Sequence, residues 1–265
     1  MASKKGVLVT FGQQTGRRAI VCIPHAAAGA AVFSPWVKIL SDVATVCAVR
    51  LPGRESLITE KPLDSVESIV ARIINDVTAI DAAELTLLGH CSGAVIAYEL
   101  AHELVARGDE RVVRLMVSSQ KAPEARSADI PSWPGFSSRQ ELVAYLRDTG
   151  WTDDRVLSSE KFVDLVEPVI TADFRAMSNY SKPPGRRPLP IPVMALCGKS
   201  DDSISDSELM SWSAETSAEL CVSRFEGDHF YLFKPAAELI AFLVQVLGAE
   251  PRSTDQIGML PSVSA

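Results

Sequence analysis

A cysteine between two glycines, at the junction of an apolar stretch and a helical pattern, constrains this chain most. The segment Leu85-Thr-Leu-Leu-Gly-His-Cys-Ser-Gly-Ala94 runs from apolar residues into a Gly-x-Cys-x-Gly turn. Apolar residues then recur at three- and four-residue spacing, as on one face of a helix. Glycines at 89 and 93 permit a sharp, strained strand-to-helix turn that lifts the residue between them out of a sheet. We therefore predict a nucleophile elbow with Cys91 at its tip.

Cys91 is the predicted nucleophile, and Ser92 is the alternative. Ser92 stands one residue later, where it would begin the helix and turn its N–H toward the reaction centre. The helix N-terminus adds partial positive charge, which favours a thiolate at Cys91. A buried structural cysteine in a tight turn would fit the same five residues. Other segments of the chain must therefore decide whether Cys91 is a nucleophile or a structural cysteine.

Composition and charge narrow the class of protein. The chain has 265 residues, 47% of them hydrophobic and 22% charged, which is typical of one globular domain with a full core. Its net charge of -7 argues against a nucleic-acid partner, which would need a basic face, although a local basic patch for an acidic protein stays open. We expect no membrane span and no signal peptide, because no apolar run is long enough and the N-terminus lacks an apolar core. Five scattered cysteines without a CxxC pair indicate reduced thiols in a cytoplasmic protein, with no disulfide framework and no metal site.

Strand-like and helical segments alternate along the chain, which predicts an α/β fold with a mostly parallel central sheet and helices on both faces. The expected strands are residues 7–11, 18–23, 43–49, 85–88, 112–118, 193–197 and 221–225, and the expected helices are 33–40, 65–78, 139–148, 159–179 and 235–247, besides the elbow helix. Residues 1–248 are expected to form a single domain. Proline-rich segments bound a helical lid insertion at about 121–185, for which a helical layer that only packs on the sheet is the alternative. Residues 249–265 are expected to form a flexible C-terminal tail.

Two residues stand where the partners of a nucleophilic cysteine are expected. Asp201 follows the strand at 193–197, where an acid can orient a histidine, and we favour it over the adjacent Asp202. Among the four histidines, only His229 lies on a loop after the last strand. The order Cys91, Asp201, His229 is that of the α/β-hydrolase triad, and it differs from the orders found in chymotrypsin and subtilisin.

The loop after the strand at 18–23 is expected to complete an oxyanion hole. Its sequence, Pro24-His-Ala-Ala-Ala-Gly29, lacks bulk, so its backbone can come close to a substrate. We predict that the N–H of Ala26 acts as a donor together with that of Ser92. His25 is predicted to shape this loop, and direct contact with the substrate is the alternative.

Other side chains are expected to surround the site. Trp133 and Phe136 of the insertion and Phe230 after the predicted histidine are candidate substrate contacts, and core packing is the alternative for the aromatic residues of the insertion. Arg50 and Arg54 follow the strand at 43–49. We expect these arginines to be solvated or locally paired, and a position at the entrance to the site is the alternative.

Five segments together match a known family: Ile23–Gly29, Val46–Glu55, Leu88–Ala94, Ile170–Phe174 and Phe225–Phe230. Over nearly its whole length the chain resembles the stand-alone type II thioesterases of polyketide and nonribosomal peptide assembly lines. The resemblance implies an α/β-hydrolase fold with a helical lid. It also implies a substrate carried as a thioester on the phosphopantetheine arm of an acyl or peptidyl carrier protein, with no cofactor of the enzyme's own. The family's usual motif has serine at Cys91 and a Gly-Gly pair at Ala27-Ala28.

These expectations lead to one reaction and three alternatives. The predicted reaction is thioester hydrolysis through a Cys-His-Asp triad and an acyl-S-enzyme intermediate, performed by a monomer. Because a cysteine forms another thioester, its acylation is nearly thermoneutral and reversible, so transfer of an acyl or aminoacyl group between two carrier proteins is the rival prediction. A noncatalytic carrier-protein binding module is a third interpretation. A small-ester hydrolase is the fourth, and it is disfavoured because an alkoxide is a poorer leaving group than a thiolate.

Overall fold

A seven-stranded sheet organises the part of the chain that the computed structural model describes, which is residues 6–12, 17–123, 136, 138–148 and 157–248. The strand order is β1-β3-β2-β4-β5-β6-β7, and all neighbours are parallel except β1 and β3. The strands are β1 Leu8–Phe11, β2 Arg18–Ile23, β3 Thr45–Val49, β4 Glu84–His90, β5 Val112–Ser118, β6 Val193–Gly198 and β7 Leu220–Phe225. The predicted α/β class and mostly parallel sheet are confirmed.

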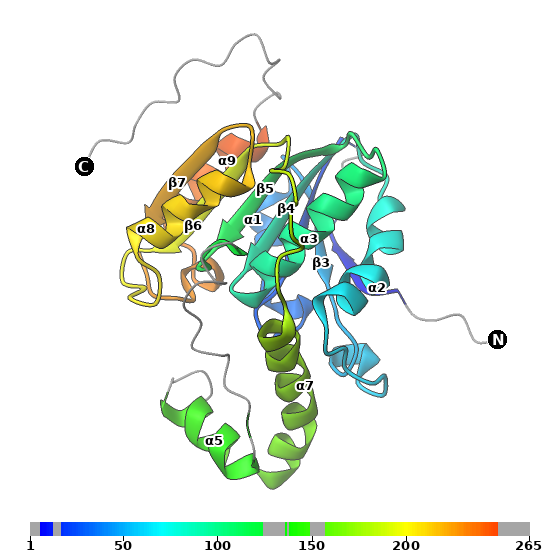
Figure 1. Ribbon diagram of the computed structural model, residues 1–265, viewed down its shortest axis with the longest axis vertical. Coiled ribbons are helices and arrows are strands. Elements are labelled where there is room, and N and C mark those ends of the chain that lie inside the picture. Colours follow the sequence, from blue (N-terminus) through cyan, green and yellow to red (C-terminus); the bar gives the residue numbers. More distant parts are fainter. Residues whose placement is uncertain (1–5, 13–16, 124–135, 137, 149–156, 249–265) are drawn as a thin grey trace, which may run out of the picture.

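Helices cover both faces of the sheet (Figure 1). The α-helices are α1 Trp36–Leu40, α2 Val66–Thr78, α3 Ser92–Ala106, α5 Arg139–Asp148, α7 Glu160–Asn179, α8 Asp206–Met210 and α9 Ala237–Gly248. Short 3-10 helices are η1 Ala30–Phe33, η2 Glu55–Leu57, η3 Ser211–Glu215 and η4 Tyr231–Phe233. Helices α2 and α3 pack together on one face, and α1 and α9 pack together on the other. The sheet thus separates two apolar cores.

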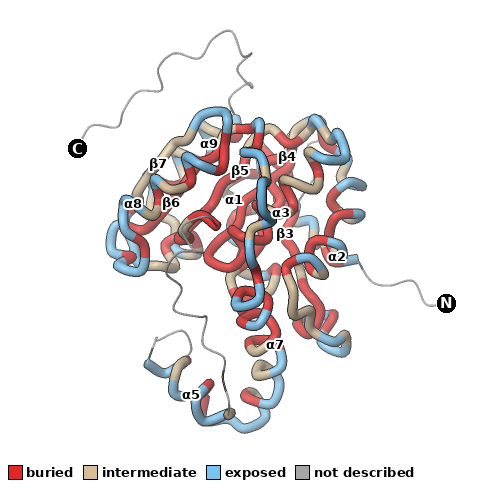
Figure 2. The backbone as a smooth tube through the Cα atoms, viewed as in Figure 1, coloured by how far each residue is buried: buried red, intermediate tan, exposed pale blue. Residues whose placement is uncertain are grey.

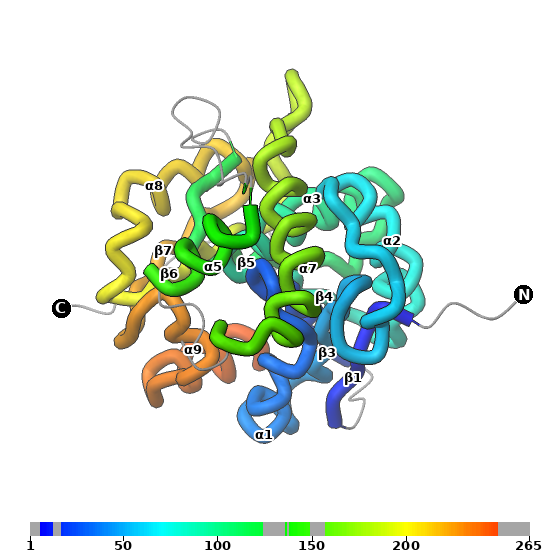
Figure 3. The backbone as a smooth tube through the Cα atoms, turned by 90° about the horizontal axis from the view of Figure 1, so that it is seen from below, coloured from blue at the N-terminus to red at the C-terminus, as the bar shows by residue number. Residues whose placement is uncertain are grey.

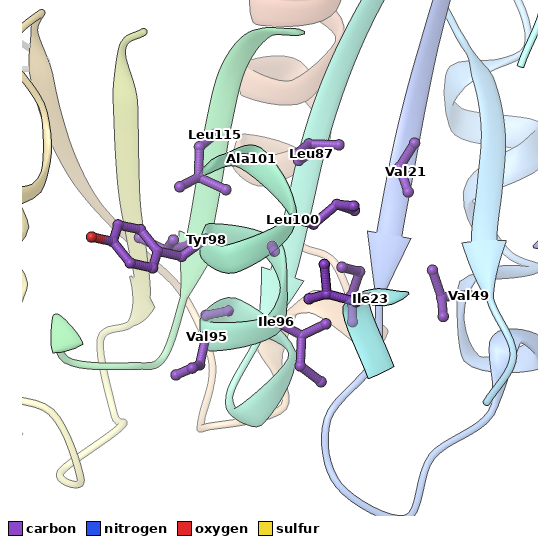
Figure 4. Close-up of a cluster of buried hydrophobic side chains, with 14 of the residues drawn as sticks. Val21, Ile23, Val49, Leu87, Val95, Ile96, Tyr98, Leu100, Ala101 and Leu115 are labelled. Atoms are coloured by element: carbon purple, nitrogen blue, oxygen red, sulfur yellow. The ribbon is translucent and has the colours of Figure 1, made fainter. Parts of the chain in front are cut away.

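The larger core lies between the sheet and the elbow helix α3 (Figure 4). Val95, Ile96 and Leu100 of that helix are buried beside Ile23 and Leu87 of the two central strands. Strands β2, β3, β4 and β6 are buried along nearly their whole length, as expected for parallel strands covered on both faces. A helix packed in this way fixes the position of its own N-terminus, where Cys91 stands.

Element boundaries differ from the predictions where the backbone makes specific hydrogen bonds. The helix expected at 33–40 is divided into η1 and α1, because Pro35 has no N–H with which to continue it. Strand β3 starts at Thr45, since the N–H groups of Val43 and Ala44 still bond to the carbonyl of Leu40. Helix α8 was not predicted, although Ser205 and Glu208 form a capping box at its start.

The strand order places the predicted site at one edge of the sheet. The chain passes from β2 outward to β3 and then returns across β2 to β4, so the connections after β2 and β4 diverge. Such a topological switch point opens a crevice at the carboxyl ends of the strands. Ile23 pairs with Gly89, which brings the loop after β2 beside the elbow.

Helices α5 and α7, inserted between β5 and β6, lie beyond this carboxyl edge (Figures 1 and 3). Helix α5 is exposed over much of its surface, whereas α7 becomes largely buried after Pro168 (Figure 2). That these helices act as a lid stays a prediction. Trp133 and the expected tail at 249–265 lie outside the described residues. None of the described helices combines the length and apolarity that crossing a membrane would require.

Candidate active site

Cys91 occupies a strained backbone position at the N-terminus of α3. Its φ of 53° and ψ of -123° lie in a region that L-residues rarely adopt. The flanking glycines are sterically required, because a Cβ atom at Gly89 would lie 2.1 Å from the carbonyl oxygen of Gly93, and one at Gly93 would lie 2.4 Å from that of Ile23. The local geometry is therefore that of the predicted elbow, with Cys91 at its tip and Ser92 as the first residue of α3.

Asp201 and His229 meet across the ends of β6 and β7. The Nδ1 atom of His229 lies 2.9 Å from Oδ2 of Asp201, and the Asp201 side chain is almost completely buried. Ser203 donates from its hydroxyl to the other carboxylate oxygen at 2.5 Å. Burial raises the pKa of Asp201, but the hydrogen bonds from His229 and Ser203 outweigh it and hold that pKa well below its usual range. Asp202, the alternative acid, is exposed.

His229 links this carboxylate to the cysteine. Burial lowers the pKa of His229, but the hydrogen bond with Asp201 and the nearby sulfur of Cys91 outweigh burial and raise the pKa to about 10. The imidazole is therefore protonated at neutral pH, with the carboxylate on one side and the sulfur on the other. The structure thus brings together the three residues that were predicted from widely separated segments.

Two further histidines, His25 and His90, lie near His229 and differ from it in charge. The ring of His90 lies 5.1 Å from that of His229 and 5.9 Å from that of His25. Burial is the main cause that lowers the pKa of His25 to about 4 and the pKa of His90 well below its usual value. Both are therefore neutral near pH 7. Within the described ranges, no three His, Cys, Asp or Glu side chains gather so as to hold a metal ion.

Ala26 lies in the loop after β2 and Ser92 begins α3, and the pairing of Ile23 with Gly89 brings these two segments together. Both are buried, and both line one small cavity of about 10 Å³. Neither backbone N–H has a hydrogen-bond acceptor within the described part of the chain. His25 Nδ1 lies 2.8 Å from the carbonyl oxygen of Ala26, and the loop-shaping role of His25 stays a prediction. Two N–H groups without acceptors are what an oxyanion hole needs before substrate arrives.

An ion pair beneath this loop was not predicted. Arg54 was expected to be solvated or paired locally, but it is buried and pairs with Asp173 of α7, 119 positions away. Sequence spacing gives no information on such a long-range pair. Both residues do fall in segments that matched the family pattern, and this was the only available signal.

Aromatic side chains from α5 and α7 face the loop. Phe136 lies 5.4 Å from Tyr145 and 5.3 Å from Phe174, between ring centroids, and this group packs with Ala26. Phe230, predicted to contact substrate, packs its ring against His25 at 5.2 Å and His229 at 5.1 Å. The predicted site is thus bordered by apolar surface on the side of the two helices.

Comparison with known proteins identifies relatives of the whole fold. A family model described as a thioesterase domain matches residues 18–246. The gramicidin S biosynthesis protein GrsT of Aneurinibacillus migulanus is 30% identical over 230 residues, which cover 86% of this chain and 88% of GrsT. Phenyloxazoline synthase MbtB of Mycobacterium tuberculosis is 36% identical over 216 residues, which cover 81% of this chain but 15% of that longer protein. The structure of the type II thioesterase BorB from the borrelidin biosynthetic cluster superposes with a TM-score of 0.79 at 27% identity, covering 92% of this chain and 100% of BorB.

Proposed function

Because this chain belongs to the thioesterase family and is a thioester hydrolase, we propose that it cleaves acyl groups from the phosphopantetheine arm of carrier proteins in polyketide or nonribosomal peptide assembly. One observation carries the proposal: an elbow cysteine lies near an imidazole that a buried carboxylate orients. The similarity to BorB and GrsT supports the class of pathway.

Cys91 is the proposed nucleophile. Cys91 reacts as a thiolate whose proton His229 holds, as expected for a nucleophile with an adjacent base. The thiolate attacks the carbonyl carbon of the incoming thioester, and the N–H groups of Ala26 and Ser92 stabilise the resulting oxyanion. The bond from carbon to the pantetheine sulfur then breaks, and that sulfur takes the proton of His229. The acyl group now rests on Cys91 as a thioester.

The same residues then hydrolyse this acyl-enzyme intermediate, with His229 acting as the base. His229, now neutral, accepts a proton from a water molecule as the water oxygen attacks the acyl carbon. The same oxyanion hole holds the second tetrahedral intermediate, which expels the Cys91 thiolate and releases a carboxylic acid. Asp201 keeps the Nδ1 proton of His229 in place and stabilises the imidazolium in both steps.

The acyl group itself is proposed to lie against the apolar side of the site. Phe136 of the helical insertion belongs to the apolar cluster that packs with Ala26, and Phe230 of the loop after β7 packs against His229. Apolar walls with a few fixed polar groups are the usual form of a small-molecule site. We propose these two side chains as acyl contacts.

Transfer between carriers is the second candidate, and the cysteine is the observation that favours it. A thioester intermediate retains the energy of the substrate thioester, so a second pantetheine thiol can accept the acyl group as readily as water can. A serine ester would not allow this so easily. Hydrolysis remains the leading proposal because the whole chain matches the thioesterase family.

One experiment separates these outcomes. A carrier protein loaded with a radiolabelled acyl group is incubated with the enzyme and with a second, empty carrier. Free labelled acid supports hydrolysis, whereas label on the second carrier supports transfer. Neither product, together with intact binding to the carrier, would mean a noncatalytic binding module.

Intact-mass spectrometry tests the nucleophile in the same reaction. We expect an acyl adduct on the wild-type protein and on Ser92→Ala, and no adduct on Cys91→Ala. An adduct that persists in Cys91→Ala and disappears in Ser92→Ala would assign the nucleophile to Ser92 instead.

A further inference from the structure

A buried ion pair holds the loop that carries the proposed oxyanion donor Ala26. Arg54 Nη2 lies 2.8 Å from Oδ1 of Asp173, and Nη1 lies 3.0 Å from Oδ2, with 7% of each side chain exposed. The same two groups reach the loop directly. The N–H of Ala27 donates to Asp173 Oδ2 at 2.7 Å, and Arg54 Nη1 donates to the carbonyl of Ala28 at 3.0 Å.

The loop needs such support because Ala27 is in a left-handed conformation. Its φ of 66° is readily adopted by glycine but disfavoured for a residue with a Cβ atom. The peptide between Ala26 and Ala27 is nevertheless fixed at both ends. His25 Nδ1 bonds to its carbonyl oxygen at 2.8 Å, and Asp173 accepts from its N–H.

We propose that Asp173 and Arg54 are positioning residues, which hold Ala27 in its left-handed conformation and so keep the N–H of Ala26 directed at the reaction centre. This inference rests on the proposed function, in which Ala26 stabilises the oxyanion. The pair does not take part in the chemistry itself, and it acts only through the loop. Preorganised donors of this kind contribute most to catalysis when they need no rearrangement during the reaction.

The position of Asp173 is itself fixed by packing. It lies in the part of α7 after Pro168, where most residues are buried, among them Ile170, Phe174 and Met177. The carboxylate is thus presented to the loop from a helix segment that is packed against the body of the protein. A change in the exposed first half of α7 need not disturb the pair.

The test replaces the pair without leaving a buried charge. Removing one partner alone would strand the other in the interior and destabilise the protein, whereas an apolar pair of similar size is often tolerated. We therefore choose Arg54→Met/Asp173→Leu. Its kcat for an acyl-carrier substrate should fall by at least about tenfold. Complete loss of one oxyanion donor typically lowers kcat by about 10²–10³, which is the upper limit expected here. KM and the rate at which iodoacetamide alkylates Cys91 should stay unchanged, because neither needs the oxyanion hole.

A matched control is the pair Arg18–Glu84, which joins β2 and β4 at their first residues, away from the carboxyl edge. It is also largely buried, at 12% and 13% side-chain exposure. Arg18→Met/Glu84→Leu should leave kcat unchanged. An equal fall in kcat in both double variants would mean a general loss of structure and would overturn the proposal.

Ala27→Gly provides the rescue. Glycine adopts the left-handed conformation without the clamp, which is the Arg54–Asp173 pair bonded to the loop. Adding Ala27→Gly to Arg54→Met/Asp173→Leu should therefore raise kcat again by about threefold or more. On its own, in the otherwise unchanged enzyme, it should alter kcat by less than about twofold. No rescue in the triple variant would contradict the role assigned to the clamp.

Hydrogen exchange tests the clamp independently of catalysis. The amide of Ala27 should exchange slowly in the wild type and much faster in Arg54→Met/Asp173→Leu, with no change in the amides of α3. If the wild type released no acyl group, the proposed function would fail. Hydrogen exchange at Ala27 would still show whether Arg54 and Asp173 hold the loop. Unchanged exchange at Ala27 would overturn the clamp even in a fully active enzyme.

Discussion

The amide nitrogen of Cys91 lies 2.8 Å from the carbonyl oxygen of Ser118, so the tip of the elbow is bonded to the end of the neighbouring strand. This bond extends the pairing of β4 and β5 by one step beyond His90. It helps to hold Cys91 in its positive-φ conformation, whose strain the packed core around α3 must offset. The position of the sulfur is therefore set by β4 and β5 and not by the local turn alone.

Gly93→Ala should abolish activity and destabilise the protein. The added methyl group would lie 2.4 Å from the carbonyl oxygen of Ile23, which is backbone and cannot rotate away. We expect a loss of about 3 kcal/mol or more in the free energy of unfolding, measured by urea denaturation. Gly108→Ala is the control, since the φ of Gly108 is positive, unlike that of Gly93, and no atom lies within 4 Å of the new Cβ. It should lose only about 1 kcal/mol and keep its activity. A loss in Gly93→Ala no larger than that in Gly108→Ala would contradict the clash at Gly93.

Asp201→Asn should greatly reduce acyl release, whereas Asp202→Asn should change it by less than about twofold. The first substitution removes the buried charge that orients and stabilises protonated His229, an effect of up to about 10⁴ in a comparable triad. The second alters an exposed carboxylate. The measurement is kcat/KM on a loaded carrier protein. Comparable losses in the two variants would reject Asp201 as the acid of the triad.

The pH dependence of stability should report the proton on His229. Burial lowers the pKa of His229, yet the hydrogen bond with Asp201 and the nearby sulfur of Cys91 raise it from 6.5 to about 10. Native protein therefore keeps a proton that the unfolded chain loses, so this stabilisation is complete below pH 6.5 and disappears as pH rises to about 10.

Unfolding of the wild type and of His229→Gln, compared from pH 5 to pH 10, checks this prediction. The stability difference between them should be largest below pH 6.5 and should shrink as pH rises through that range. At acid pH, the contribution of Asp201 should be lost as pH falls below its ordinary value of 3.8. A difference that stays constant from pH 6 to pH 10 would contradict a protonated His229.

Phe136→Ala should weaken productive binding of apolar acyl groups without affecting the cysteine. Its ring packs on Phe174 and Tyr145 at the side of the site formed by α5 and α7. We expect KM for an octanoyl thioester to rise several-fold, since an apolar contact of this size is worth about 1–3 kcal/mol. KM for an acetyl thioester should change little, and so should alkylation of Cys91 by iodoacetamide. A uniform loss on both substrates would assign Phe136 to packing of the insertion.

Local patterns in the sequence determined much of the fold and of the proposed site. The alternation of apolar strands with amphipathic helices predicted the α/β class. Apolar residues at three- and four-residue spacing indicate a helix, and short apolar runs indicate a buried strand. The two glycines around Cys91 predicted the elbow, since that turn excludes a Cβ at either position. The places of Asp201 and His229 after late strands predicted their meeting, because the carboxyl ends of parallel strands share one edge of the sheet.

Only the tertiary structure decided the contacts between distant segments. The antiparallel pairing of β1 with β3 and the pairing of Arg54 with Asp173 have no local signal, since charge pairing across 119 positions depends on which surfaces the fold brings together. The same holds for the charge on His229, which its neighbours set through burial and hydrogen bonds and not through its own sequence context. The sequence thus specified which residues end each element, and three-dimensional packing decided how those ends act on one another.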